Sequence, residues 1–243
     1  MQLQNPFFSE VNKLLQKIEQ TQAQAMENAA QKVALCLEND GIIHTFGCGH
    51  SASITLDAFH RSGCFAAVDA ILDPALMFQS GAHTGTALER MPNYANAVMD
   101  RHTFQPQDIL WVASNSGKNP AGIDAVLYAK KYGVTTIAIT AASAHQKSTS
   151  RHPSGKMLKD VADIVLDNQC PANETALEIN QIQVAPVSTI AGIAIFQAVL
   201  FRAAQILAEK GQDLPVYRSS NAGGDEHNTK LAQKYAGRIK HLH

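Results

Sequence analysis

The stretch IIHTFGCGHS, residues 42–51, joins a short apolar run to a glycine-rich turn. Residues 42–46 are almost continuously apolar, as expected of a strand that is covered on both faces of a sheet. Gly47 and Gly49 allow the backbone to turn tightly, and a helical pattern begins directly behind them. A strand, a tight turn and a helix in this order predict an α/β fold with a parallel sheet and right-handed crossovers.

Four further short runs of the chain are also almost continuously apolar, as the first predicted strand is. Predicted helices separate them, at about residues 51–61, 88–101 and 119–132, and another follows at about 183–209. We therefore predict a parallel sheet of five strands. The four runs are FAAVDAI (65–71), DILWVAS (108–114), VTTIAIT (134–140) and VADIVLD (161–167).

Helical segments are predicted at both ends of this alternating region. Apolar residues recur at spacings of three and four over residues 6–20 and 22–38, as two helices or as one long bent helix. No internal repeat or shift in composition indicates a second domain. The prediction is a single domain over residues 1–243, with N-terminal helices at 1–40, an α/β core at 41–210 and a C-terminal loop and helix at 211–243.

Composition and charge argue against several classes of function. Twenty Lys and Arg balance 21 Asp and Glu, so the chain carries no charge excess that would hold nucleic acid or an anionic membrane. The longest apolar run, Val184 to Ala198, is broken by polar residues and falls short of the ~20 residues of a spanning helix. Four dispersed cysteines indicate reduced thiols, and no secretory signal is recognisable at the N-terminus. We expect a cytoplasmic protein that binds neither nucleic acid nor membrane.

Polar turns follow the first and third predicted strands. The first turn is Gly47-Cys48-Gly49-His50-Ser51, and the second is Ser114-Asn115-Ser116-Gly117. The carboxyl ends of parallel strands are where open α/β sheets bind ligands, and a helix N-terminus behind a turn favours an anion. The two turns together predict one phosphate site, although Ser114 has an alternative role as a helix cap. Ser188 and Thr189 lie at the start of the late apolar helix, where they could either cap the helix or contact a ligand.

These three motifs together resemble the sugar isomerase (SIS) domain of phosphosugar isomerases and phosphosugar-binding regulators. The resemblance covers about residues 10–210, and the segments SRHPSGK (150–156), YRSSN (217–221) and DEHN (225–228) resemble a branch related to phosphoheptose isomerases. It implies a flavodoxin-like three-layer α/β/α sandwich. It also implies a homodimer or homotetramer with active sites near subunit boundaries, and chemistry without a cofactor.

The resemblance also assigns roles to individual residues. Relatives use a glutamate on the helix after the glycine turn as acid/base, but an ungapped count places Arg61 there. Asp57, one turn earlier, is the nearest carboxylate and would pair with Arg61. Glu178, His227 and His83 are the alternatives. The predicted phosphate-binding residues are Gly49, Ser51, Ser114, Asn115, Ser116, Asn119, Ser188 and Thr189.

The predicted activity is the interconversion of the aldose and ketose forms of a sugar phosphate through an enediol. Two alternatives stay open: a phosphosugar sensor without chemistry, and an amino-sugar phosphate lyase or etherase. The basic loop 147–159, with Arg151, could clamp a second anionic group or be solvated. Ten histidines include no H-x-x-x-H or H-E-x-x-H pattern, so the spacing predicts no metal site. By resemblance, zinc between subunits remains an alternative.

Overall fold

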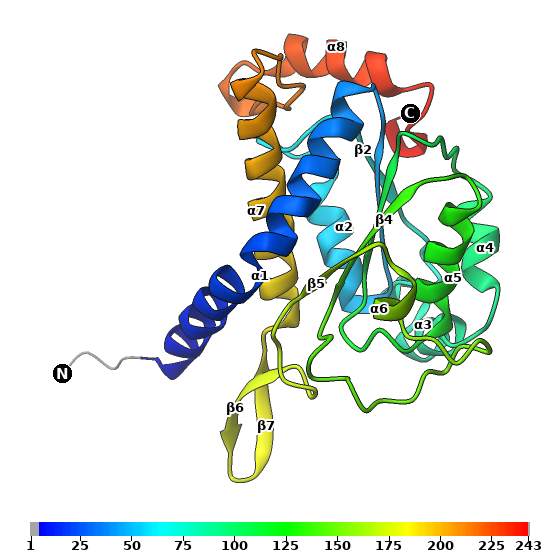
Figure 1. Ribbon diagram of the computed structural model, residues 1–243, viewed down its shortest axis with the longest axis vertical. Helices are drawn as coiled ribbons and strands as arrows, with labels where there is room; N and C mark the ends of the chain where they lie inside the picture. The colour runs from blue at the N-terminus through cyan, green and yellow to red at the C-terminus, as the bar shows by residue number, and fades with distance from the viewer. Residues whose placement is uncertain (1–4, 243) are drawn as a thin grey trace.

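The computed structural model describes residues 5–242 and contains the predicted parallel sheet (Figure 1). The strand order is β2-β1-β3-β4-β5, with every neighbouring pair parallel. This is the flavodoxin-like order, in which the chain changes direction between β1 and β3. The fold prediction is therefore confirmed. The strands are β1 (Ile43–Gly47), β2 (Val68–Ile71), β3 (Ile109–Ala113), β4 (Thr135–Thr140) and β5 (Ile164–Asp167).

Helices cover both faces of the sheet because alternate strand residues point to opposite sides. Trp111 of β3 packs edge to face on Phe196 of α7, with ring centres 4.9 Å apart, while Leu110 and Val112 lie in the core of the other layer. The first layer holds α1 (Pro6–Glu38), α2 (Ala52–Ala58) and α7 (Ser188–Glu209). The second holds α4 (Tyr94–Met99), α5 (Pro120–Lys130) and α6 (Leu158–Val161), with α3 (Ala82–Glu89) beside them.

The N-terminal region is one helix of 33 residues, which decides between the two alternatives above. Asn5 caps it by accepting a hydrogen bond from the Phe7 amide at 3.0 Å, and Pro6 occupies the first turn. Its C-terminal half is buried against α7 through residues such as Ala30 and Val33. Its N-terminal half projects past β5, where Phe8 is 67% exposed (Figure 1).

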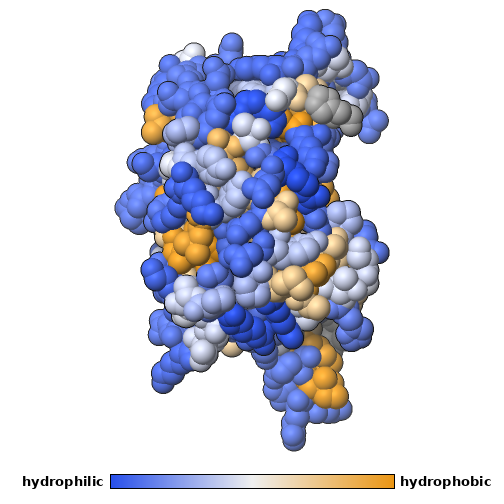
Figure 2. Space-filling view, turned by 90° about the vertical axis from the view of Figure 1, so that its right-hand side faces the viewer, coloured by the Kyte–Doolittle hydropathy of each residue, from blue (hydrophilic) through white to orange (hydrophobic). Residues whose placement is uncertain are grey.

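The late apolar helix α7 has 22 residues, so it is longer than the apolar run that the sequence suggested. By length and composition alone it would pass for a membrane-spanning helix. In this fold it packs against α1 and the sheet, and Phe196 and Val199 are fully buried. Burial in the core accounts for the apolar residues on one side of α7, whereas Phe201 on the same helix is 67% exposed. The face of the molecule that carries α4 and α5 is largely hydrophilic, with scattered apolar patches (Figure 2).

Two regions differ from the predicted elements. The predicted helix at 88–101 is two helices, α3 and α4, because Asn93 before α4 has a left-handed backbone with φ of 66°. An antiparallel hairpin, β6 (Thr175–Ile179) and β7 (Ile182–Pro186), was not anticipated and projects from the body (Figure 1). The terminal helix α8 (Asp225–Tyr235) lies within the predicted C-terminal loop and helix at 211–243. Short 3₁₀ turns are η1 (Gly49–Ser51), η2 (Phe78–Ser80), η3 (Ser220–Ala222) and η4 (Lys240–Leu242).

Candidate functional site

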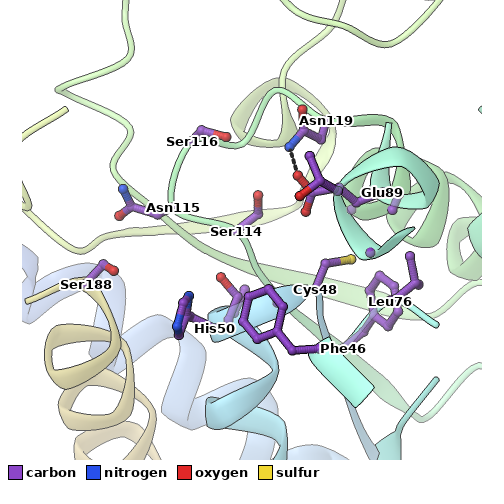
Figure 3. Close-up of a pocket in the computed structure, with 18 of the residues that line it drawn as sticks. Phe46, Cys48, His50, Leu76, Glu89, Ser114, Asn115, Ser116, Asn119 and Ser188 are labelled. Atoms are coloured by element: carbon purple, nitrogen blue, oxygen red, sulfur yellow. Dashed lines mark hydrogen bonds between the residues drawn. The ribbon is translucent and has the colours of Figure 1, made fainter. Parts of the chain in front are cut away.

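A pocket of about 210 Å³ lies at the carboxyl ends of β1 and β3 (Figure 3). This is the point where the strand order reverses, so the helices that follow the two strands diverge and leave a crevice. The pocket is lined by both polar turns, by α3 and by the start of α7. Seven of the eight predicted phosphate-binding residues line it: Gly49, Ser51, Ser114, Asn115, Ser116, Asn119 and Ser188. The eighth, Thr189, lines a small hollow beside it together with Ser51 and Asn115.

The glycine turn after β1 is built by close backbone approach. A side chain at Gly47 would meet the Ser51 carbonyl oxygen at 2.6 Å, and Gly49 adopts a positive φ of 54°. The Gly49 amide donates to the Leu76 carbonyl at 2.9 Å, so it is already engaged within the protein. Ser51 precedes α2 and makes no capping bond with its side chain. Its hydroxyl therefore remains available to a ligand in the pocket.

The second turn presents a donor that the fold leaves without a partner. Asn115 is 9% exposed, and its Oδ1 accepts a hydrogen bond from Asn168 at 2.7 Å. Its Nδ2 is buried and has no hydrogen-bond partner among residues 5–242. Ser114 Oγ accepts from the Gly117 amide at 3.3 Å within the turn, and Asn119 rather than Ser114 occupies the N-cap position of α5. An unsatisfied buried donor costs about 1–3 kcal/mol, which a bound anion would offset.

A carboxylate that the sequence did not single out faces both turns. Glu89, the last residue of α3, accepts a hydrogen bond from Asn119 Nδ2 at 2.5 Å (Figure 3). Arg151 in turn donates to Asn119 Oδ1 at 2.8 Å. Burial raises the pKa of the Glu89 carboxyl above its ordinary value, and the negative charge of Glu174 adds to this rise. Glu89 follows the Gly-, His- and Thr-rich stretch 80–86 closely in the sequence, which was its one local signal.

A second carboxylate lies on the side of the pocket formed by α7. Glu174 also lines the pocket, and its Oε2 accepts a hydrogen bond from Ser188 Oγ at 2.9 Å. Glu174 precedes β6 and Ser188 follows β7, so the base of the hairpin holds both residues at the pocket wall. The sequence argument selected Glu178 in this region, which lies further along the chain, on β6 itself.

None of the catalytic candidates Asp57, Glu178 and His227 lines this pocket. Asp57 accepts hydrogen bonds from Arg61 at 2.6 Å and from Gln197 at 2.8 Å, which confirms the predicted pairing with Arg61. Glu178 lies on the exposed hairpin, where Gln183 donates to it. His227 lies on α8 and donates a hydrogen bond from Nε2 to the Val216 carbonyl at 2.9 Å.

Two smaller expectations concern His83 and the cysteines. His83 is exposed on α3 and does not line the pocket, although the same helix supplies Glu89. The four cysteines are all unpaired, as their spacing predicted.

Comparison with known proteins places this architecture among relatives. A model of the SIS domain family matches residues 6–141. UPF0309 protein GK1441 of Geobacillus kaustophilus is 37% identical over 238 residues, covering 97% of this chain and 95% of the relative. UPF0309 protein Lm4b_02611 of Listeria monocytogenes is 38% identical over 230 residues, covering 93% of each chain.

Solved structures show the same fold at lower sequence identity. The phosphoheptose isomerase GmhA from Neisseria gonorrhoeae aligns with a TM-score of 0.54 at 19% identity, over 82% of this chain and 95% of its own. A phosphoheptose isomerase from Francisella tularensis aligns with a TM-score of 0.51 at 20% identity, over 83% of this chain and 96% of its own.

Proposed function

Because this chain belongs to the SIS-domain family, we propose that it binds a phosphorylated sugar in the pocket at β1 and β3 and interconverts its aldose and ketose forms through an enediol. The observation that carries the catalytic part of the proposal is Glu89. It is a partly desolvated carboxylate with a raised pKa, placed beside two turns that suit a phosphate.

The phosphate binds between the two polar turns. The Ser51 and Ser116 hydroxyls and the unpaired Asn115 amide line the same pocket and are the donors available to its oxygens. Hydrogen bonds to a charged group contribute about 1.5–3 kcal/mol each. A remote phosphate held in this way fixes the position of the sugar carbons relative to the pocket wall.

Glu89 is the general base that moves a proton between adjacent carbons of the sugar. A base works best when its pKa approaches the working pH, and burial shifts the pKa of Glu89 in that direction. The Asn119 amide fixes one carboxylate oxygen, and Arg151 fixes Asn119, so the base is oriented before substrate binds. Asn119 is therefore a positioning residue rather than a phosphate ligand. Glu174, across the pocket, is the second group able to exchange a proton with the sugar oxygens.

Binding and exchange are tested separately. A thermal-shift screen against a panel of sugar phosphates identifies ligands, and proton NMR in deuterated water then follows exchange at the carbon next to the carbonyl. Glu89→Gln is expected to keep the ligand-induced shift and to lower exchange by about 10²–10⁴-fold. Glu226→Gln, on an exposed face of α8, removes a carboxylate far from the pocket and is expected to change neither.

Three results would contradict the proposal. Full exchange by Glu89→Gln would place the base elsewhere. Binding by the wild type without any exchange would establish a phosphosugar-binding protein without chemistry. Ser116→Asp puts a negative charge at the phosphate position and is expected to abolish binding. Equal sugar-phosphate affinity of this variant and the wild type would show that the phosphate does not bind in this pocket.

A further inference from the structure

A second cluster of polar side chains is buried at the opposite ends of the strands. His44 and Asp69 are the second residues of β1 and β2 and lie side by side in the sheet register, and His102 follows α4. His44 and Asp69 are fully buried, and the His102 side chain is 1% exposed. None of the three belongs to the phosphosugar pocket.

Three potential ligand atoms converge on one point in this cluster, all within 4.8 Å of one another. The Nδ1 atoms of His44 and His102 lie 2.9 Å and 2.7 Å from the same Asp69 oxygen, Oδ2. The other Asp69 oxygen, Oδ1, is buried without a hydrogen-bond partner among the described residues. One oxygen can accept both N–H groups through its two lone pairs, so hydrogen bonding satisfies Oδ2 but leaves Oδ1 unpaired in a buried site. A cation bound by the three side chains would take the place of the two ring protons and would give the buried carboxylate a further partner.

The surroundings of His44 fit a metal ligand as well. Its other ring nitrogen, Nε2, lies 3.4 Å from Asp108 Oδ2. Asp108 is itself fixed by Arg238 at 2.6 Å and by the Ile42 amide at 2.8 Å. Metal-binding histidines commonly donate their second N–H to a carboxylate, which sets the tautomer and orients the ring.

We propose that His44, Asp69 and His102 bind one zinc ion through Nδ1, Oδ2 and Nδ1. A tetrahedral ion at about 2.0–2.1 Å from its ligands separates them by about 3.3 Å, so each side chain needs to shift by less than about an ångström. Complete burial leaves no room for a substrate at the ion, so the site would be structural, and its tetrahedral coordination requires a fourth ligand. Such a site would tie β1, β2 and the segment after α4 together. His241 in η4, with its ring centre 6.3 Å from that of His102, is a further potential ligand.

The first measurement is the zinc content of the full chain. Protein stripped with a chelator is reloaded with Zn²⁺, freed of excess ion, and analysed by mass spectrometry for metals. The expected result is one zinc per chain. In a separate sample that keeps free Zn²⁺ at about a hundredfold excess over Kd, the melting temperature is expected to rise by about 5–10 °C relative to stripped protein. Wild-type protein that retains well under one zinc per chain overturns the proposal.

Variants then identify the ligands. His102→Ala is expected to lower zinc affinity by at least about a hundredfold, in line with the loss of a metal-ligand interaction, and His102→Cys, which keeps a zinc ligand, is expected to restore part of it. The matched control is His152→Ala. His152 also contacts a carboxylate, with Nε2 3.0 Å from Asp124, but lies outside the cluster. Equal zinc binding by His102→Ala and the wild type, or loss of zinc from His152→Ala, refutes the assignment. Circular dichroism of the stripped variants verifies that each is folded.

Discussion

Gly117 closes the second polar turn and offers a sharp test of how the fold shapes the pocket. Its φ is +62°, and a side-chain carbon added there would lie 2.8 Å from Thr140 Oγ1, closer than real contacts allow. That hydroxyl donates to the Asn115 carbonyl at 3.0 Å. Gly117→Ala therefore strains the backbone and also displaces a hydrogen bond that holds the Asn115 segment of the turn.

The two effects can be separated with a second glycine. Gly211, behind α7, has a φ of +70° and nothing within 4 Å of the added carbon, so Gly211→Ala carries the backbone cost alone, about 1–2 kcal/mol. Gly117→Ala carries the same cost and disrupts the bond of Thr140, which is 2% exposed. A buried polar group left unpaired adds about 1–3 kcal/mol. The difference between the variants in free energy of unfolding is thus expected to be about 1–3 kcal/mol.

Urea unfolding measures this difference through the fluorescence of Trp111, the single tryptophan, which lies buried in β3. A difference of this size lowers the melting temperature of Gly117→Ala by roughly 2–12 °C relative to Gly211→Ala. Sugar-phosphate affinity is expected to fall at least about tenfold in Gly117→Ala alone, equivalent to about 1.4 kcal/mol of binding. Equal losses of stability in both variants, or unchanged affinity in Gly117→Ala, would refute the reasoning.

Three further predictions concern the identity of the general base, the fall of the exchange rate at low pH (the acid limb of the pH–rate profile) and the assembly of the chain into oligomers. Asp57→Asn is expected to keep the rate of proton exchange within about an order of magnitude of the wild-type rate, because Asp57 lies outside the pocket. A loss of about 10²-fold or more would identify Asp57 as the general base instead of Glu89. The ionised form of Glu89 is the active one, so exchange is expected to fall as pH drops through its raised pKa. The positive charge of Arg151 lowers that pKa, so Arg151→Gln is expected to move the acid limb of the pH–rate profile to higher pH; a limb that stays or moves down contradicts this. Deleting residues 1–20 removes the projecting half of α1 with its exposed Phe8 and is expected to shift an oligomer toward monomer in light scattering; a monomeric intact chain contradicts this.

Local sequence patterns were sufficient for the sheet. Continuous apolar runs mark strands covered on both faces, and all five predicted runs contain the observed strands or all but their last residue. The hairpin was missed although a local signal existed. Asn180 and Gln181 lie between the two short strands, and both have a positive φ, as the central residues of a two-residue hairpin turn do. The apolar residues of β7 are followed almost at once by those of α7, so the two elements read as one apolar run and the boundary between them was not recognised.

Sequence patterns alone predict the strands, the two glycine-containing turns and most of the side chains that surround the proposed phosphate. These depend on neighbouring residues and on the rule that carboxyl ends of parallel strands share one edge. The contact between Glu89 and Asn119, 30 positions apart, and the contact between His102 and Asp69, 33 positions apart, form only in the folded chain. Such meetings depend on the order of strands in the sheet and on how each crossover helix packs. A short window of sequence does not contain that information, because the contacts form between segments separated by whole elements.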